Sequence, residues 1–382
     1  MNASELLNYI PKEKLEELCL EYKVNYQVKK LDGLTMFQLL LYSFLTTRRN
    51  SYRVMEEFYH SIAFEEIANQ VHSGVRYNSI RDRLVAINPH YFEAIFKYCF
   101  EKFEGQLDKR QNLILFDSTL VAASSKLLEN GIRINKQGDK RYIKYTLGFK
   151  DIPAHVRIFK AQEYASEDIA LFETIMSSGA LPDDIVVFDR GISSRQVYES
   201  FNENHLQFVT RVNENIRTNV LVEYQILESE NENHLLFQSD QQVQLFNRKQ
   251  KGTKSYLRLI KCTDKESKKT ILFLTNIENL TTSEIAAIYK KRWEIEVFFR
   301  FIKQQLNFSH LMSRNENGIM VILYMTLISS ILLTAYKKSN QLKGYKIPKI
   351  KLANEIEALI IKDIIIKCGG NPSKIDQYLN SS

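Results

Sequence analysis

The chain has 382 residues, with 52 Lys and Arg against 45 Asp and Glu, so its formal net charge is +7. A hydrophobic content of 44% and a charged content of 25% exclude global disorder, and 13 Gly with 6 Pro exclude a collagen-like or Pro-rich chain. The length corresponds to two or three domains. The small positive charge gives only weak support for a polyanionic partner.

Cysteine usage and the N-terminus indicate the compartment. Cys19, Cys99, Cys262 and Cys368 lie far apart and form no CxxC pair, so the sequence predicts no disulfide framework. The first twenty residues carry acids early and lack the apolar stretch of a signal peptide. We therefore expect a cytoplasmic protein.

The first 108 residues are predicted to be helical. Apolar residues recur at helical spacing in the segments 14–22, 36–45, 52–62 and 91–103. The segment 76–87 adds Arg76, Arg81 and Arg83 on a short helical pattern. These arginines fit either a small DNA-binding helix or a charged, solvated face.

After residue 111 the pattern changes to short apolar strands that alternate with helices. Ser166 is expected to cap a helix whose first turn holds Glu167 and Asp168. Strands so apolar imply a sheet that is covered on both faces by helices. The predicted strands are 113–116, 142–149, 155–161, 185–188 and 207–212, and the predicted helices are 166–177 and 193–201.

Residues 217–276 predict an inserted β-subdomain, and the rest of the chain predicts helices. Five strand-like runs occur at 220–227, 234–238, 243–246, 255–262 and 270–275. A single long helix is expected from Thr282 or Ser283 to about Leu306. The uncharged segment 318–336 is long enough to span a membrane, but its Ser and Thr residues favour a buried core helix. A basic helical tail follows, with Lys337, Lys338, Lys343, Lys346, Lys349 and Lys351.

Two of the predicted strands run into an aspartate. The apolar run 114–116 is followed by Asp117, and the run 186–188 is followed by Asp189. An aspartate beyond the carboxyl end of a buried strand lies at the rim of the sheet, where α/β proteins place their sites. Either residue alone also fits a turn or a helix cap.

The predicted helix 282–306 places polar residues along one side. At about 100° per residue, Tyr289, Arg292, Glu296, Arg300 and Lys303 share an arc of under about 90°. Beside it runs an apolar stripe that would face the core. Arg292 paired with Glu296 fits an ordinary solvated face. Tyr289 and Lys303 on the same arc favour a functional ridge. The stripe consists of Ile288, Ile295, Phe299 and Ile302.

Three carboxylates at one place repel one another unless a cation lies between them. Asp117, Asp189 and Glu296 would offer hard oxygen ligands, which select Mg²⁺, with Mn²⁺ as a substitute, rather than zinc. Two such ions about 3.5–4 Å apart serve phosphodiester exchange. Basic side chains beside them would bind the phosphates of the substrate.

The spacing Tyr289-x2-Arg292-x3-Glu296-x6-Lys303 matches the YREK signature of bacterial insertion-sequence transposases of the IS-four type. The sequence resembles that family from about residue 31 to residue 336, notably in the segments 31–58 and 188–212. Asp117, Asp189 and Glu296 correspond to its DDE triad. Ile192 stands where the family often has an aromatic residue.

The resemblance implies an α/β fold: an RNase-H-like mixed sheet flanked by helices, interrupted by a β-strand insertion, with an N-terminal all-helical domain. The insertion accounts for the 107 residues from Asp189 to Glu296 (296 − 189). The implied segments are a helical N-terminal domain with candidate DNA binding (1–108), the first part of the catalytic core (109–214), the β-rich insertion (215–278), the second part of the core with the Glu-bearing helix (279–340), and a helical basic tail (341–382).

The resemblance also implies a cut-and-paste DNA transposase that cleaves and joins transposon ends through a hairpin intermediate. Its partners would be double-stranded DNA (terminal inverted repeats and target DNA) and a second copy in a synaptic homodimer, with no membrane. The enzyme would be cytoplasmic and nucleoid-associated. The implied DNA contacts are Tyr289, Arg292, Trp293, Arg300 and Lys303. Trp293 would stack on a base, although packing against the insertion explains it equally well.

Three alternatives remain open at this stage. The segment 248–269 holds nine basic residues and two acids, which fits either a grip on transposon ends or the protection of an edge strand. The triplet Asp117-Ser118-Thr119 is similar to the D-[ST]-G of aspartic proteases, but its third residue is not Gly. A catalytically inactive, transposase-derived DNA-binding protein would carry the same fold.

Overall fold

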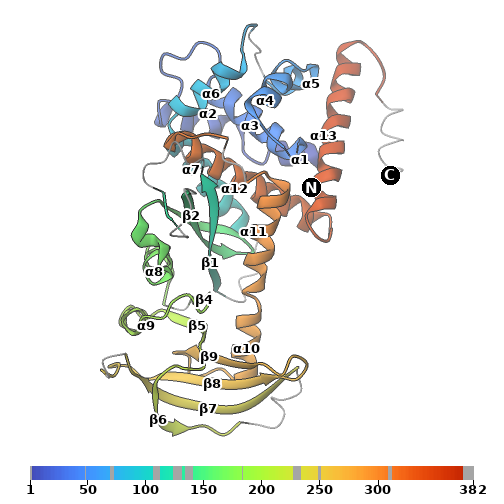
Figure 1. Cartoon of the computed structure of the whole chain (residues 1–382). Helices are drawn as coiled ribbons and strands as arrows, with labels where there is room; N and C mark the ends of the chain where they lie inside the picture. The colour runs from blue at the N-terminus through green and yellow to red at the C-terminus, as the bar shows by residue number, and fades with distance from the viewer. Residues whose placement is uncertain are drawn as a thin grey trace. The chain divides into compact units, whose positions relative to one another are not determined.

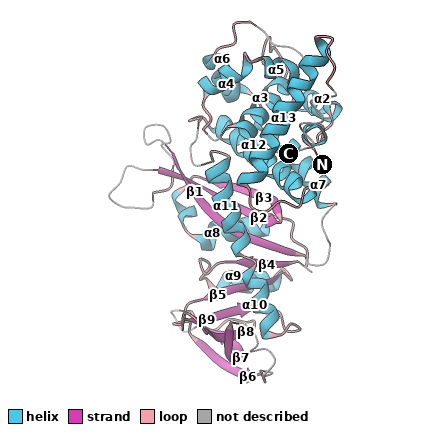
Figure 2. Ribbon diagram, turned by 90° about the vertical axis from the view of Figure 1, so that its right-hand side faces the viewer, coloured by secondary structure: helices cyan, strands magenta, loops and turns pink. Residues whose placement is uncertain are grey.

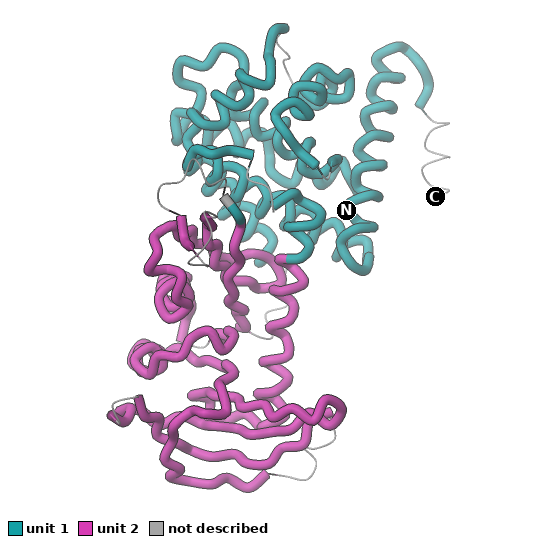
Figure 3. Tube along the Cα trace, in the orientation of Figure 1, with its two compact units in different colours: residues 1–107, 122–127, 300–382 teal, residues 108–121, 128–299 magenta. Residues whose placement is uncertain are grey.

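The computed structural model describes residues 2–47, 49–68, 73–105, 112–123, 131–133, 141–182, 184–226, 234–247, 251–308 and 312–372. The chain divides into two compact units (Figure 3). Unit 1 comprises residues 1–107, 122–127 and 300–382, and unit 2 comprises residues 108–121 and 128–299.

Unit 1 is built from helices. The predicted segment 52–62 is divided into α4 and α5, because the Ser61 hydroxyl accepts from the Phe64 N–H and starts a new helix. The other predicted helices lie within a few residues of their expected bounds. The helices are α1 (Ala3–Leu7), α2 (Lys12–Glu21), α3 (Gly33–Thr46), α4 (Tyr52–Tyr59), α5 (Ile62–Ile67), α6 (Tyr77–Ala86), α7 (Pro89–Glu104), the end of α11 (Trp293–Gln305), α12 (Glu316–Ser339) and α13 (Lys346–Lys367).

The long apolar helix α12 is the core of unit 1. It packs against α3, α6, α7 and α13, and 94% of its most apolar window is buried inside the protein. The hydroxyls of Thr326, Ser330 and Thr334 donate to backbone carbonyls of the same helix, so the polar groups cost little in this environment. The expectation of a buried core helix is confirmed by this packing.

Two cations, one from the candidate DNA-binding segment 76–87 and one from the basic tail, have structural roles in unit 1. Arg83 donates from Nε to the Leu31 carbonyl (2.7 Å) and from Nη2 to the Val24 carbonyl (2.6 Å). The buried Lys349 donates from Nζ to the Thr47 carbonyl (2.8 Å), at the end of α3. Both side chains thus donate to carbonyls at helix ends or in loops.

Unit 2 is built on a mixed sheet, whose strands form one array in Figure 2. The strand order is β3-β2-β1-β4-β5-β9-β8-β7-β6. β1, β4 and β5 run parallel, whereas β9, β8, β7 and β6 continue the sheet in antiparallel fashion. The strands are β1 (Leu113–Ala123), β2 (Arg141–Lys150), β3 (Ile152–Phe159), β4 (Ile185–Phe188), β5 (Gln207–Val212), β6 (Thr218–Glu223), β7 (Leu235–Leu245), β8 (Leu257–Asp264) and β9 (Thr270–Thr275).

Helices of unit 2 pack on this sheet. The helices α8 (Glu167–Met176) and α9 (Arg195–Glu203) share an apolar core with β1, β4 and β5, and α10 (Thr282–Lys290) packs on β4 and β5 (Figure 1). Ser166 stands before α8, but its side chain makes no capping hydrogen bond, contrary to expectation. The predicted α/β class, with a mixed sheet flanked by helices and a helical N-terminal region, is confirmed.

Two details of the prediction were wrong. β1 continues past Asp117 to Ala123, so this aspartate lies within a strand and not at its end. The runs 234–238 and 243–246 belong to one strand, β7, whose register shifts between Phe237 and Ser239. The strands of the segment 217–276 continue the core sheet, because β9 pairs with β5.

Candidate functional site

Asp117 and Asp189 lie at the same level of two neighbouring strands. In the parallel pairing of β1 with β4, Leu115 lies opposite Val187, and each aspartate follows two residues later. Parallel strands in register bring residues at equal offsets to the same edge. The pairing with β4 stops before Asp117, while β1 runs on, which places this side chain beyond the shared part of the ladder.

The carboxyl of Asp117 is costly to ionise. Burial raises its pKa to about 7, and the neighbouring Asp189 charge raises it as well. The Ser118 N–H, which donates to Asp117 Oδ1 at 2.8 Å, and the Arg292 guanidinium act in the opposite direction. A carboxyl with this balance is stabilised in its charged form by any additional cation.

The turn after β4 holds Asp189 in place. Its Oδ1 accepts from the Gly191 N–H at 2.8 Å. The Thr210 hydroxyl on β5 lies 3.0 Å from the carbonyl oxygens of both Phe188 and Asp189. A side chain at position 191 would bring its Cβ within 2.8 Å of Asp189 Oδ1, so the turn requires glycine there.

The single long helix expected from 282 to 306 is two helices. α10 ends at Lys290 and α11 begins at Trp293, with Lys291 and Arg292 in a turn. Backbone hydrogen bonds of the i→i+3 type join the two, including Arg292 N–H to the Tyr289 carbonyl at 3.0 Å. The continuous arc from Tyr289 to Lys303 was therefore wrong, because the tighter turn changes the rotation per residue.

The Arg292 guanidinium bridges two of the predicted acids. Its Nη1 lies 3.7 Å from Asp117 Oδ2, and its Nη2 donates to Glu296 Oε1 one turn along α11. The side chain is 16% exposed, and its Nε is buried without a hydrogen-bond partner among the residues that the structure describes. The structure thus brings Asp117, Arg292 and Glu296 together around one cation, with Asp189 beside Asp117.

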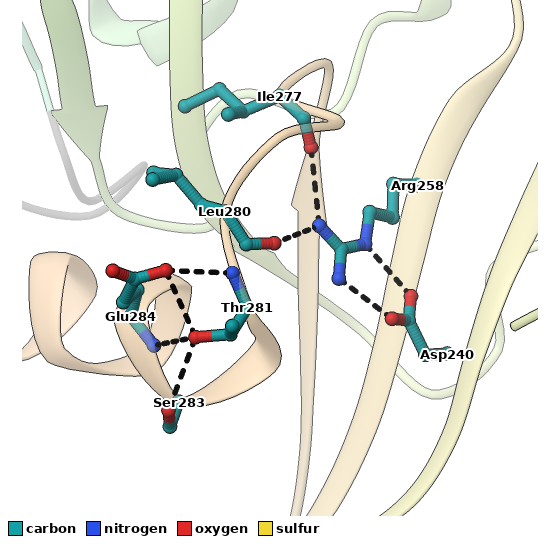
Figure 4. Close-up of polar contacts among 7 residues, drawn as sticks. All are labelled: Asp240, Arg258, Ile277, Leu280, Thr281, Ser283 and Glu284. Atoms are coloured by element: carbon teal, nitrogen blue, oxygen red, sulfur yellow. Dashed lines mark hydrogen bonds and ion pairs between the residues drawn. The ribbon is translucent and has the colours of Figure 1, made fainter. Parts of the chain in front are cut away.

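The start of α10 is anchored to the β-insertion (Figure 4). Arg258 on β8 forms a buried, two-pronged ion pair with Asp240 on β7, at 2.9 and 2.7 Å. The same guanidinium donates to the carbonyls of Ile277 and Leu280, just before the helix. Thr281 and Glu284 then form a capping box. The insertion therefore fixes the helix that leads to Tyr289 and Arg292.

Tyr289 lies between aromatic and cationic groups. Its ring centroid is 5.4 Å from that of Phe273, and the Cζ atoms of Arg292 and Arg211 lie 5.7 and 5.9 Å from it. Burial raises the pKa of its hydroxyl. Tyr289 thus contacts Arg292 through a cation–π interaction. Tyr289 also lines a pocket together with residues of β7, β9 and α10.

The remaining predicted DNA contacts lie on α11. Trp293 is 54% exposed, so half of its surface is accessible to a ligand. Glu296, Arg300 and Lys303 follow at intervals of four and three residues and share one face of this helix. Arg300 and Lys303 belong to unit 1. In the basic segment 248–269, residues 248–250 lie outside the described part, and residues 257–275 form the hairpin β8–β9.

The donor set fits a hard divalent cation. All three predicted ligands are carboxylates, and an added cation would stabilise the charged form of Asp117, whose pKa is raised by burial and by the Asp189 charge. In the described part of the chain, no three His, Cys, Asp or Glu side chains are already gathered around one point. Arg292 supplies the positive charge between Asp117 and Glu296 in this arrangement.

Three further residues touch the site and were not among the predicted site residues. Ser118, Lys144 and Glu167 form hydrogen bonds beside Asp117. The sequence marked Glu167 only as an acid in the first turn of a helix. Its role depends on the pairing of β1 with β2, which no local pattern reveals.

The known proteins that this chain resembles are transposases. Residues 108–332 match the family model described as a transposase DDE domain. A Sinorhizobium fredii protein that bears a transposase name, y4zB, is 28% identical over 72% of this chain and 73% of its own length. A Synechocystis protein named for the transposase of the insertion sequence element IS4SA is 28% identical over 63% and 65% of the two chains. The Geobacillus stearothermophilus protein named for the transposase of IS5377 is 30% identical over 39% and 38%.

A solved structure shares the fold. The cryo-EM structure of a piggyBac transposase synaptic complex with hairpin DNA covers 99% of this chain and 84% of its own, with a TM-score of 0.51 and 12% sequence identity. At this identity the likeness concerns the fold alone. Because the family model spans more than half of the residues, the chain belongs to the DDE transposases, of the insertion-sequence type that its YREK spacing indicates.

Proposed function

We propose that the protein is a cut-and-paste DNA transposase in which Asp117, Asp189 and Glu296 hold two Mg²⁺ ions. The observation that carries this is the meeting of Asp117 and Glu296 on one buried cation, Arg292, with Asp189 beside them. Mn²⁺ would substitute, since it accepts the same hard oxygen ligands. When bound, such ions activate a nucleophilic oxygen and stabilise the leaving oxygen of a phosphodiester.

The reaction is phosphoryl transfer without oxidation or reduction. A water oxygen bonds to phosphorus at the transposon end while the bond from phosphorus to the 3′ oxygen breaks. The water proton passes to solvent, and the 3′ oxygen leaves as a hydroxyl. The oxygen of that hydroxyl then bonds to a phosphorus of the opposite strand, which gives a hairpin, or of the target DNA. Its proton passes to solvent, while the bond from that phosphorus to its own 3′ oxygen breaks and leaves a new 3′ hydroxyl.

The chain's own cations would hold the DNA. Arg292 already lies beside two carboxylates, so a scissile phosphate offers it a competing anion at the same place. Arg300 and Lys303, on the face of α11 that carries Glu296, would bind phosphates further along the strand. Tyr289 supports Arg292, and the exposed Trp293 would stack on a base.

Double-stranded DNA is the expected partner, as terminal inverted repeats and as target. The piggyBac structure with the same fold is a synaptic complex with hairpin DNA, and this supports the proposal of synapsis and a hairpin for this chain. Two ends must be brought together, so we propose a homodimer in the synaptic complex. The enzyme would act in the cytoplasm, on the nucleoid.

The test is cleavage of a duplex that carries the terminal repeat, in Mg²⁺ and in EDTA. Wild type should nick the end in Mg²⁺ only, and Glu296→Gln should be inactive. Glu294→Gln is the matched control, since Glu294 lies on the same helix but is exposed. Equal cleavage by all three proteins would reject the assignment. Binding to the repeat without nicking in Mn²⁺ would favour the alternative, an inactive DNA-binding descendant.

A further inference from the structure

The first turn of α8 contacts the strand that carries Asp117. Glu167 accepts from the Ser118 hydroxyl through Oε2 (2.8 Å) and from the Lys144 ammonium through Oε1 (2.8 Å). Ser118 also lies 2.9 Å from the Thr146 hydroxyl on β2. The backbone N–H of Ser118 donates to Asp117 Oδ1. A single hydroxyl-bearing residue therefore links Glu167 to the first catalytic carboxylate.

The same side chain contacts the turn that carries Asp189. A Cβ atom on Gly191 would lie 2.8 Å from Glu167 Cγ and 2.8 Å from Asp189 Oδ1. Glu167 thus lies against Gly191, and the N–H of Gly191 donates to Asp189. Glu167 is therefore next to the residues that hold both aspartates.

The neighbouring residue secures the rest of that loop. Asp168 Oδ1 accepts from the backbone N–H groups of Ser193 (2.6 Å) and Ser194 (2.8 Å), and its Oδ2 accepts from the Ser193 hydroxyl (3.1 Å). Ser194 is the N-cap position of α9, whose own side chains provide no cap. The start of α8 is therefore fixed to the segment that follows Asp189.

A simple helix-dipole role does not explain this arrangement. An acid in a first turn is favourable when it is exposed to solvent. Lys144, however, is only 2% exposed, and its ammonium also donates to the Ala165 carbonyl at 3.1 Å. Burying an ammonium is expensive unless it is paired and hydrogen-bonded. Lys144, which is buried, thus forms a hydrogen-bonded ion pair with Glu167 beside the site.

We propose that Glu167, fixed by Lys144, is a positioning residue of the metal site, which orients Asp117 through Ser118 and Asp189 through Gly191. Each of its oxygens already accepts from a protein donor, so it acts through its neighbours. The proposal rests on the proposed function only in taking Asp117 and Asp189 as metal ligands. Outer-shell partners of this kind typically change metal affinity or activity by about 10–100-fold.

The test is Mn²⁺ binding to the full chain without DNA, measured by electron paramagnetic resonance. Glu167→Gln should bind Mn²⁺ about 10-fold or more weakly than wild type. Glu223→Gln removes the same charge from an exposed position on the edge strand β6 and should bind like wild type. Equal affinity of the two variants would overturn the proposal.

A second variant separates positioning from charge balance. Glu167→Gln leaves the Lys144 ammonium buried without a carboxylate and is expected to lower the Tm. The double variant Glu167→Gln with Lys144→Met should recover the Tm, because no unpaired charge is buried. Its Mn²⁺ affinity should stay low. Recovery of wild-type Mn²⁺ affinity would show that Glu167 only balances Lys144, and would overturn the proposal.

The outcome is separable from that of the proposed function. If wild type binds Mn²⁺ but cleaves no DNA, while Glu167→Gln still weakens Mn²⁺ binding, the positioning role stands and the transposition chemistry fails. If wild type cleaves DNA in Mg²⁺ and Glu167→Gln matches Glu223→Gln in both binding and cleavage, the positioning role alone fails. A wild type that binds no Mn²⁺ would overturn both.

Discussion

Arg292 Nη1 lies 3.7 Å from Asp117 Oδ2, and this contact joins a strand of the core to the junction between α10 and α11. Because of this contact, the Arg292 guanidinium has two opposing effects on metal binding at Asp117. The cation stabilises the carboxylate that a metal ion would need, yet it occupies space beside it. In the proposed function, the metal site and the phosphate-binding site would therefore share Arg292.

Replacement of Arg292 should move metal binding and catalysis in opposite directions. Arg292→Gln frees Asp117 and Glu296 for a metal ion, so we expect tighter Mn²⁺ binding. The variant also lacks the donor for the scissile phosphate, and cleavage should fall about 100-fold, as for a lost transition-state donor. Lys291→Gln removes the neighbouring exposed cation and should change both by little. If Arg292→Gln lost both Mn²⁺ affinity and cleavage, the proposal that Arg292 serves both sites would be contradicted.

The pH dependence of stability should report the Asp117 carboxyl. Its folded pKa of about 7 lies above its ordinary value, so the folded state binds more protons than the unfolded state between about pH 4 and 7. This carboxyl therefore makes its full contribution to the stability of the metal-free protein at low pH, and the contribution is lost as the pH rises through about 7.

Asp117→Asn removes that dependence. At pH 8 in EDTA the variant should be more stable than wild type, on the order of 4 kcal/mol, because the pKa of Asp117 rises from 3.8 to about 7 and one pKa unit corresponds to about 1.4 kcal/mol. At pH 5 the difference should be clearly smaller, because the carboxyl is still protonated in the folded state and only the unfolded state has ionised. Urea unfolding at both pH values measures this, and an unchanged difference between them would refute the assignment to Asp117.

The anchor of α10 should behave as a buried ion pair. Arg258→Met leaves Asp240 unpaired in the sheet and should cost about 3–5 kcal/mol. Adding Asp240→Leu should restore most of this stability, because no charge then stays buried alone. Cleavage by the double variant should remain below wild type, since the carbonyls before α10 have lost their donor. Full recovery of cleavage would argue against an anchoring role.

Gly191 should not tolerate a side chain. Gly191→Ala places a Cβ 2.8 Å from both Asp189 Oδ1 and Glu167 Cγ, so one of them must move. We expect a loss of cleavage of about 10-fold or more, in the range seen for disturbed outer-shell contacts. Gly105→Ala is the control, as its nearest atoms would be 3.8 Å away. The two alanine variants are compared in the same cleavage assay, and similar rates would exclude the crowding effect.

Sequence patterns predicted the elements of the fold well where the physics is local. Helical spacing located α2, α3, α6 and α7, and apolar runs located β4 and β5 with nearly their observed bounds. The strand-end pattern found Asp189 but misplaced Asp117, because β1 continues beyond its pairing with β4. The extent of a strand depends on its partners, and these are set by topology.

The sequence named candidate residues for the site but could not predict how they connect. The fixed offsets of the YREK signature identified Arg292 and Glu296, and the structure joins them. The helix α10 ends after Lys290 although the sequence has no Gly or Pro at this point. Helical spacing therefore predicted one continuous helix. Lys144 and Glu167 lie 23 residues apart and meet only when β2 and α8 pack together. Such a pair leaves no periodic signal.

The assignment of Asp117 and Asp189 as metal ligands is tested most directly by the variant Asp189→Cys. A thiolate is a softer ligand than a carboxylate, and Mn²⁺ tolerates it better than Mg²⁺ does. The measurement is cleavage of the terminal-repeat duplex by this variant in each metal. If Asp189 is a metal ligand, the variant should not cleave in Mg²⁺ and should partly recover cleavage in Mn²⁺. Cleavage in Mg²⁺ at the wild-type rate would contradict it.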